Sequence, residues 1–275
     1  MTKAPTRPSI IDRLDVNISN LSSAVAFARK GSGRWPEWER YLVVHGEPAF
    51  LIGNICGTCE FFFERIEEAS NGVDVEELSG TLAAGIDHIH PEVANALGKL
   101  LPSGSYHLVL MRLTPHLIAA GSDADYFAHE QVQQIGFDPV MEGGTHHPRI
   151  DYYRVKPTEG LPVIGDQDRT DLSFDFIIPL HRQNQLDEER IRYYMQRLEE
   201  AVMPTAVAVS VLDVKQPEIE NVQDHRCMGH YLLDGHHKLA AAARTGKPLT
   251  LLSFIANDQG VSNSDDLQKY LNLHS

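Results

Sequence analysis

The feature that most constrains the fold is the run YLLDGHHKLAAAARTGKPLTLLSFI, at residues 231–255. An apolar strand ends at Asp234, and Gly235 permits a tight turn because it has no Cβ. A helix begins at once and is closed by Gly246, a typical helix terminator. Another apolar strand follows over residues 249–255. Two apolar strands joined through a helix predict a layered structure in which the helix packs on a sheet.

The start of this helix has the chemistry of a phosphate site. N–H groups at a helix N-terminus carry partial positive charge and favour anions. Gly235 allows a ligand to approach the backbone, and His236, His237 and Lys238 supply further donors. The alternative is an ordinary junction in which Asp234 caps the helix and the histidines lie at the surface.

The rest of the chain predicts an α+β fold. In the C-terminal part we expect strands at 174–180 and 205–214 and, between them, a helix at 186–201. In the N-terminal part we expect a loose arm up to about residue 36, with one short helix near 19–29, and then a hairpin at 40–54. Three helices are expected within 56–69, 75–86 and 90–101. A strand interrupted by proline is expected at 105–121. Glycines and prolines near 157–165 suggest two domains, at 1–160 and 161–275.

Charge and hydropathy exclude several functions. The chain has 24 Lys and Arg against 38 Asp and Glu, a formal net charge of −14. This excess repels phosphate backbones and anionic membrane surfaces, so we expect neither a nucleic-acid nor a membrane partner. There is no run of 18 apolar residues, and the first residues lack the apolar core of a signal peptide. We therefore expect a cytoplasmic protein.

Three segments resemble the ParB/sulfiredoxin-like superfamily in order and spacing: IIPLHRQNQLDEERIRYYMQRL, TAVAVSVLDV and HYLLDGHHKLAAAARTGKPLTLLSFI. The resemblance covers about residues 171–255. It implies a ParB/sulfiredoxin-like C-terminal domain packed on an N-terminal α/β region of unknown type. In that superfamily a Gly-x-x-Arg turn holds nucleotide phosphates, those of CTP in partition proteins, of ATP in sulfiredoxin, and of ADP or ATP in related free-serine kinases.

Carried onto this chain, the resemblance implies a phosphate cradle at Gly235, His236, His237 and Lys238, with Arg182 as a second contact. Lys238 replaces the usual arginine and offers a point charge instead of a bidentate fork. A histidine, His236, stands where sulfiredoxin has its reactive cysteine, which argues against sulfinic-acid reduction. Only about 20 residues follow Ile255, which leaves no room for the DNA-binding helices of partition proteins.

The expected function is therefore binding of a nucleotide or another phosphorylated small molecule. An ATP- or ADP-dependent phosphotransferase of this type would also need Mg²⁺ and a base. Asp187, Glu188 and Glu189 are candidates, although acids at a helix start are also favoured by its dipole alone. A noncatalytic regulatory binding module is the alternative, and the catalytic residues stay unassigned.

The cysteines suggest a different chemistry. Cys56 and Cys59 form a C-x-x-C, and Cys227 and His230 form a C-x-x-H. Together they supply a Cys₃His set, a known tetrahedral zinc composition. Alternatively, Cys56 and Cys59 form a redox disulfide, or all three cysteines are small buried apolar residues. A zinc-stapled or redox protein is thus a second alternative function.

Overall fold

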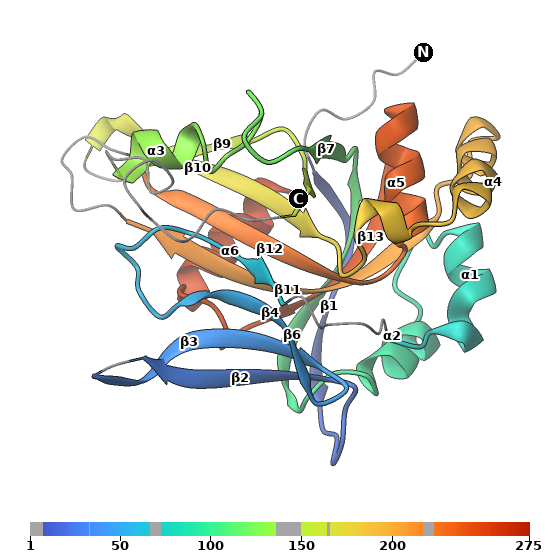
Figure 1. Ribbon diagram of the computed structural model, residues 1–275, viewed down its shortest axis with the longest axis horizontal. Coiled ribbons are helices and arrows are strands. Elements are labelled where there is room, and N and C mark those ends of the chain that lie inside the picture. The colour runs from blue at the N-terminus through green and yellow to red at the C-terminus, as the bar shows by residue number, and fades with distance from the viewer. Residues whose placement is uncertain (1–7, 33, 67–72, 136–149, 164–165, 217–222) are drawn as a thin grey trace.

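The computed structural model describes residues 8–32, 34–66, 73–135, 150–163, 166–216 and 223–275. It has an α+β fold, as the sequence predicts, with a large mixed sheet, a small antiparallel sheet and helices around them (Figure 1). None of the helices in these ranges combines the length and the apolar character that a bilayer span requires.

The large sheet has nine strands, and its central strands are covered on both faces. Their order is β1 (Ser9–Ile18), β6 (Gly104–Leu113), β13 (Leu249–Ala256), β11 (Thr205–Lys215), β12 (His225–Asp234), β10 (Asp166–Ile178), β8 (Tyr152–Arg154) and β7 (His116–Ile118), with β9 (Thr158–Val163) paired to β10. The pairs β11–β13 and β10–β12 are parallel, and the others are antiparallel. All eleven residues of β11 are buried, which explains its continuous Val and Ala run.

The small sheet and the helices form the outer layers. The small sheet runs β2 (Val25–Ser32), β3 (Trp35–Val44), β4 (Glu47–Asn54) and β5 (Glu64–Arg65). The helices are η1 (Glu76–Leu78), α1 (Ser79–Ala84), α2 (Pro91–Gly98), α3 (Glu130–Ile135), η2 (Gln183–Gln185), α4 (Glu188–Glu199), α5 (His236–Thr245) and α6 (Ser264–Leu273). On one face of the large sheet, α4 and α5 cover one end and α6 the other, and the small sheet packs on the opposite face.

Two N-terminal predictions are wrong. The expected loose arm with a helix near 19–29 is instead β1 and β2. Leu14, Val16 and Ile18 alternate with polar residues, and this period-two pattern suits a half-exposed edge strand. In the segment 56–69, whose later residues are expected to form a helix, residues 64–65 form the short β5 instead, and residues 67–69 lie outside the described ranges. The preceding residues Phe61 to Phe63 are all buried, and a helix cannot turn three consecutive side chains toward one core.

The other strong patterns are confirmed. The hairpin is β3–β4, helices form within 75–86 and 90–101, and the strand with a proline interruption is β6 followed by β7. In the C-terminal part β10, α4, β11, β12, α5 and β13 occur in the predicted order. The ranges 1–160 and 161–275 share the nine-stranded sheet, because β6 pairs with β13.

Candidate functional site

The turn between β12 and α5 has the backbone geometry that its sequence predicts. Gly235 is the N-cap and lies in the left-handed region at φ 98° and ψ 21°. Its place is tight as well, because an added Cβ would lie 2.7 Å from the Cβ of Ala206 on β11. Since glycine has no side chain, it leaves the first-turn amides of α5 to other acceptors. The carboxylate of Asp234 accepts a hydrogen bond from Lys238 Nζ at 2.8 Å.

Lys238 holds this turn against the sheet. Its side chain is only 3% exposed, and Nζ also donates to the carbonyl oxygen of Thr205 at 2.9 Å. Burial lowers the pKa of Lys238, while the charge of Asp234 opposes that shift. The ammonium is thus engaged with Asp234 and Thr205, and these contacts give no support to a direct contact with phosphate.

His236 and His237 tie neighbouring elements to the start of α5. His236 Nε2 accepts the backbone N–H of Leu180 at 3.0 Å, just after β10. His237 Nε2 accepts the backbone N–H of Asp187 at 3.0 Å, at the start of α4. Burial lowers the pKa of both histidines. A neutral imidazole that accepts at Nε2 carries its proton at Nδ1, so each ring keeps one N–H donor.

A cleft of about 280 Å³ neighbours this turn through the contact of His181 with His236, although no residue of the turn lines it. It follows the end of β10, and its wall includes His181, whose ring packs edge-on against that of His236 at 4.4 Å between centroids. It is lined by Arg65, Ile150, Asp151, Pro179, His181, Arg182, Gln183 and Asn184. Two guanidinium groups face a single carboxylate there, so the lining has an excess of positive charge although the whole chain is acidic.

The position of the cleft follows from the sheet topology. β10 and β12 are parallel neighbours, and both their carboxyl ends point toward the cleft and the α5 turn. Ligands of open α/β sheets bind outside the carboxyl ends of parallel strands. The Nε atom of Arg65 donates to the carbonyl of Leu180 at 2.6 Å, which fixes the guanidinium at the edge of this cleft.

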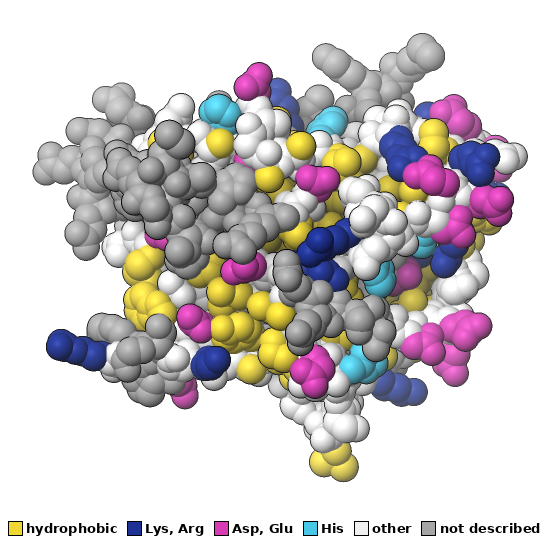
Figure 2. All heavy atoms as spheres, in the orientation of Figure 1, with side chains coloured by type: hydrophobic (Ala, Val, Ile, Leu, Met, Phe, Trp, Pro, Cys, Tyr) yellow, Lys and Arg dark blue, Asp and Glu magenta, His cyan; other side chains and the backbone are white. Residues whose placement is uncertain are grey.

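A second cleft of about 250 Å³ lies on the other side of Gln183, which lines both clefts. The side-chain amide of Gln183 donates to the hydroxyl of Tyr153 at 2.8 Å and separates the two spaces. Arg244, which also lines the second cleft, is paired in two hydrogen bonds with Glu188 at 2.7 and 2.8 Å. Charged side chains of both signs therefore gather over the α4 end of the molecule (Figure 2).

Two of the three acids expected to hold Mg²⁺ have partners within the protein. Asp187 is the N-cap of α4 and accepts the amides of Glu189 and Arg190, which lowers its pKa. Glu188 pairs with Arg244. In the ranges that the structure describes, the only three His, Cys, Asp or Glu residues near enough to share an ion are instead Asp87, His88 and His90, which precede α2.

The four expected zinc ligands do not converge. Cys56 and Cys59 form a disulfide in the loop between β4 and β5. Cys227 lies on the β12 face toward the small sheet, where burial raises its pKa to about 12. His230 lies on the opposite face, with Nδ1 at 2.8 Å from Ser210 Oγ and Nε2 at 3.2 Å from Asp175 Oδ1. The donor set does not fit one tetrahedral ion.

Of the residues predicted to form the phosphate site, Arg182 is the one that lines the cleft. His181 and Arg65 also line it, and the sequence did not predict them. His181 directly precedes Arg182 and follows the strand, so its place in the strand–Pro–Leu–His–Arg run was a usable signal. Nothing in the sequence connects Arg65 with a cleft that otherwise consists of residues 150–184.

Comparison of the chain with protein-family models, with curated proteins and with solved structures finds no match. The function therefore has to be inferred from the geometry of the site itself.

Proposed function

We propose that this protein binds a nucleotide or another phosphorylated small molecule in the cleft between the end of β10 and the turn before α5. The observation that carries the proposal is the glycine-capped N-terminus of α5 beside a cleft lined by Arg182, Arg65 and His181. Amides at a helix N-terminus and guanidinium groups are the donors that phosphate oxygens prefer.

The arrangement of strands is in keeping with a ParB/sulfiredoxin-like fold in residues 161–275. The elements β10, α4, β11, β12, α5 and β13 follow the order that the resemblance implies. The Gly-x-x-Lys turn also stands at the start of α5, where that superfamily holds phosphates. The proposal assigns the same kind of ligand to this turn, such as ATP, ADP or CTP.

The side chains of the turn divide into supporting and contacting groups. Lys238 and the Nε2 atoms of His236 and His237 support the turn, because each has a partner within the protein. The proposed contacting groups are the guanidinium of Arg182, which lines the cleft, and the first-turn amides of α5, which belong to the neighbouring turn. A cleft of about 280 Å³ lies near the lower limit for small-molecule sites, so it fits a phosphate group better than a whole nucleotide.

Binding without phosphoryl transfer is the form of the proposal that the contacts favour. Transfer needs oxygen ligands for Mg²⁺ and a base close to the phosphates. Asp187 and Glu188, two of the three acids that suit this role by sequence, are a helix cap and an ion-pair partner. If the protein hydrolysed or transferred the terminal phosphate in the presence of Mg²⁺, that result would favour the phosphotransferase function over binding alone.

Calorimetric titration of the protein with ATP, ADP, CTP and inorganic phosphate tests this proposal. Arg182→Ala should weaken binding by about tenfold to a hundredfold, the loss of one charge-assisted contact. Arg244→Ala is the matched control, because this arginine pairs with Glu188 and lines the other cleft. Absence of binding by all four compounds at millimolar concentration, or equal weakening by both variants, would overturn the proposal.

A further inference from the structure

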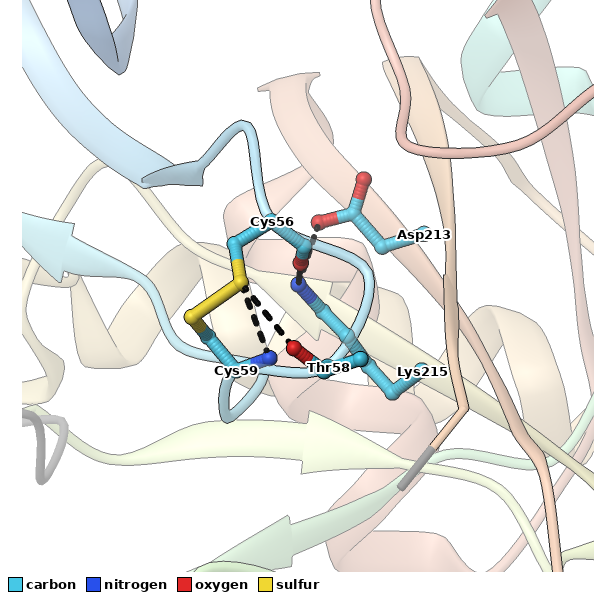
Figure 3. Close-up of a disulfide and its surroundings, with 5 residues drawn as sticks. All are labelled: Cys56, Thr58, Cys59, Asp213 and Lys215. Carbon is cyan, nitrogen blue, oxygen red and sulfur yellow. Dashed lines mark hydrogen bonds and ion pairs between the residues drawn. A yellow bond between two sulfur atoms is a disulfide. The ribbon is translucent and has the colours of Figure 1, made fainter. Parts of the chain in front are cut away.

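The Cys56–Cys59 disulfide occupies a loop with distinctive hydrogen bonds. Both cysteines are partly exposed, so reagents in solvent can reach the loop. Cys56 Sγ accepts the backbone N–H of Cys59 at 3.1 Å and lies 3.6 Å from the hydroxyl of Thr58 (Figure 3). Both interactions involve the Cys56 sulfur, so a negative charge would be better stabilised on this atom.

The loop is fastened to the end of β11 by two hydrogen bonds. Lys215 Nζ donates to the carbonyl oxygen of Cys56 at 2.8 Å, and the N–H of Gln216 donates to the carbonyl oxygen of Gly57 at 2.9 Å. Figure 3 shows Lys215 reaching from β11 to the Cys56 carbonyl, between the loop and Asp213. These bonds involve the backbone of the loop and not its sulfurs. The loop can therefore keep its shape when the disulfide opens.

Lys215 is itself held in place by a buried ion pair. Its Nζ lies 4.0 Å from Asp213 Oδ2, and Arg40 pairs with both oxygens of Asp213, at 2.9 and 2.6 Å. The charges of Arg40 and Asp213 offset each other, and Glu60 in the loop lies within electrostatic range of Lys215. The positive and negative side chains near the loop therefore offset one another and favour neither sulfur. The two sulfurs differ in their hydrogen bonds, which are made to Cys56 Sγ.

We propose that Cys56–Cys59 is a redox-active disulfide that exchanges electrons with a dithiol partner, and that Cys56 is the sulfur that forms the mixed disulfide. The inference does not depend on the proposed ligand of the α5 turn. Cys227 takes no part, because it is fully buried.

The exchange needs only the partner's two thiols. A partner thiolate attacks Cys56 Sγ, and the bond to Cys59 breaks, so that its electron pair goes to Cys59 Sγ, which takes a proton from water. The partner's second thiolate then attacks the partner sulfur of the mixed disulfide. Cys56 Sγ leaves as a thiolate, stabilised by the Cys59 amide and the Thr58 hydroxyl. The partner is oxidised by two electrons to a disulfide, and the C-x-x-C is reduced by two electrons.

Reaction of single-cysteine variants with dithiodipyridine, followed by thiol release, compares the two sulfurs directly. Cys59→Ser leaves Cys56 as the exposed thiol, and Cys56→Ser leaves Cys59. The double variant, which retains only buried Cys227, gives the baseline. At about pH 7 the Cys56 thiol should react severalfold faster than the Cys59 thiol, because the Cys59 amide and the Thr58 hydroxyl stabilise its thiolate. Adding Thr58→Val should slow Cys56 severalfold, and Thr58→Ser should restore it.

A turnover assay tests whether the pair acts in exchange. Reduction of insulin disulfides by dithiothreitol should be faster with wild-type protein than with Cys56→Ser, whose fold is checked by circular dichroism. Equal rates for the two, equal reactivity of Cys56 and Cys59, or indifference of Cys56 to Thr58→Val would each overturn the proposal. So would about one zinc ion per chain with both loop thiols protected, because that result would assign the loop to a metal.

Discussion

Replacing Gly235 by alanine tests the tight turn that opens α5. Two costs follow from the structure. At φ 98° a residue with a Cβ is strained by about 1–2 kcal/mol. The new Cβ would also lie 2.7 Å from Ala206 Cβ and 2.9 Å from Ala206 Cα, distances that real Cβ atoms do not tolerate. Overpacking of this kind costs about 1–3 kcal/mol, so the free energy of unfolding should fall by about 2–5 kcal/mol in total.

The other end of the same helix provides the control. Gly246 lies at φ 62°, and an added Cβ would meet no atom within 4 Å. Gly246→Ala therefore tests the backbone cost alone, about 1–2 kcal/mol. Urea denaturation followed by circular dichroism gives both values. If Gly235→Ala costs no more than Gly246→Ala, the close approach of Gly235 to β11 is refuted. If the two costs differ as expected, anion binding by the Gly235→Ala variant can then be tested below its unfolding midpoint.

Two further predictions concern buried charged and titratable groups. Burial lowers the pKa of His225 to about 4, so the unfolded chain, with a value near 6.5, binds this proton more readily. Stability should therefore fall by up to about 3 kcal/mol as the pH drops from about 6.5 to 4, and His225→Gln should flatten that slope in thermal melts; an unchanged slope would contradict it. Arg40→Met leaves Asp213 buried without its main partner and should cost about 3–5 kcal/mol in urea denaturation. Asp213→Asn in the same background should recover part of this loss, and equal stability of the single and double variants would argue against the ion pair.

Local patterns were sufficient for the C-terminal half of the fold. The apolar run of β11 and the strand–glycine–helix pattern around Gly235 depend on neighbouring residues, and the structure has the predicted elements at both. Edge strands carry a weaker signal, because half of β1 is exposed, and its polar residues resemble those of a loop. The sequence predicts a helix in the aromatic segment after Cys59, and this prediction fails because the burial of that segment depends on distant partners such as Tyr126 and Phe176.

The candidate site shows the same limit. Arg182 and the α5 turn could be identified by sequence, because both belong to continuous motifs. The hydrogen bond from Lys238 to Thr205 could not, since Thr205 lies 33 positions away and accepts through its backbone. The sequence does not show that the strand ending at Asp234 begins as early as His225; given that start, the alternation of side chains places Cys227 and His230, three positions apart, on opposite faces of the sheet.

The place of β13 in the large sheet bears on how the chain is made. Leu249 of β13 pairs with Leu113 of β6, and on its other side β13 pairs with β11. During synthesis, β1 and β6 leave the ribosome while this central strand is still missing. The edge of β6 that pairs with β13 stays exposed until the residues up to Ala256 have been translated. Pairings between such distant residues form slowly, and newly made chains are vulnerable to aggregation during that interval.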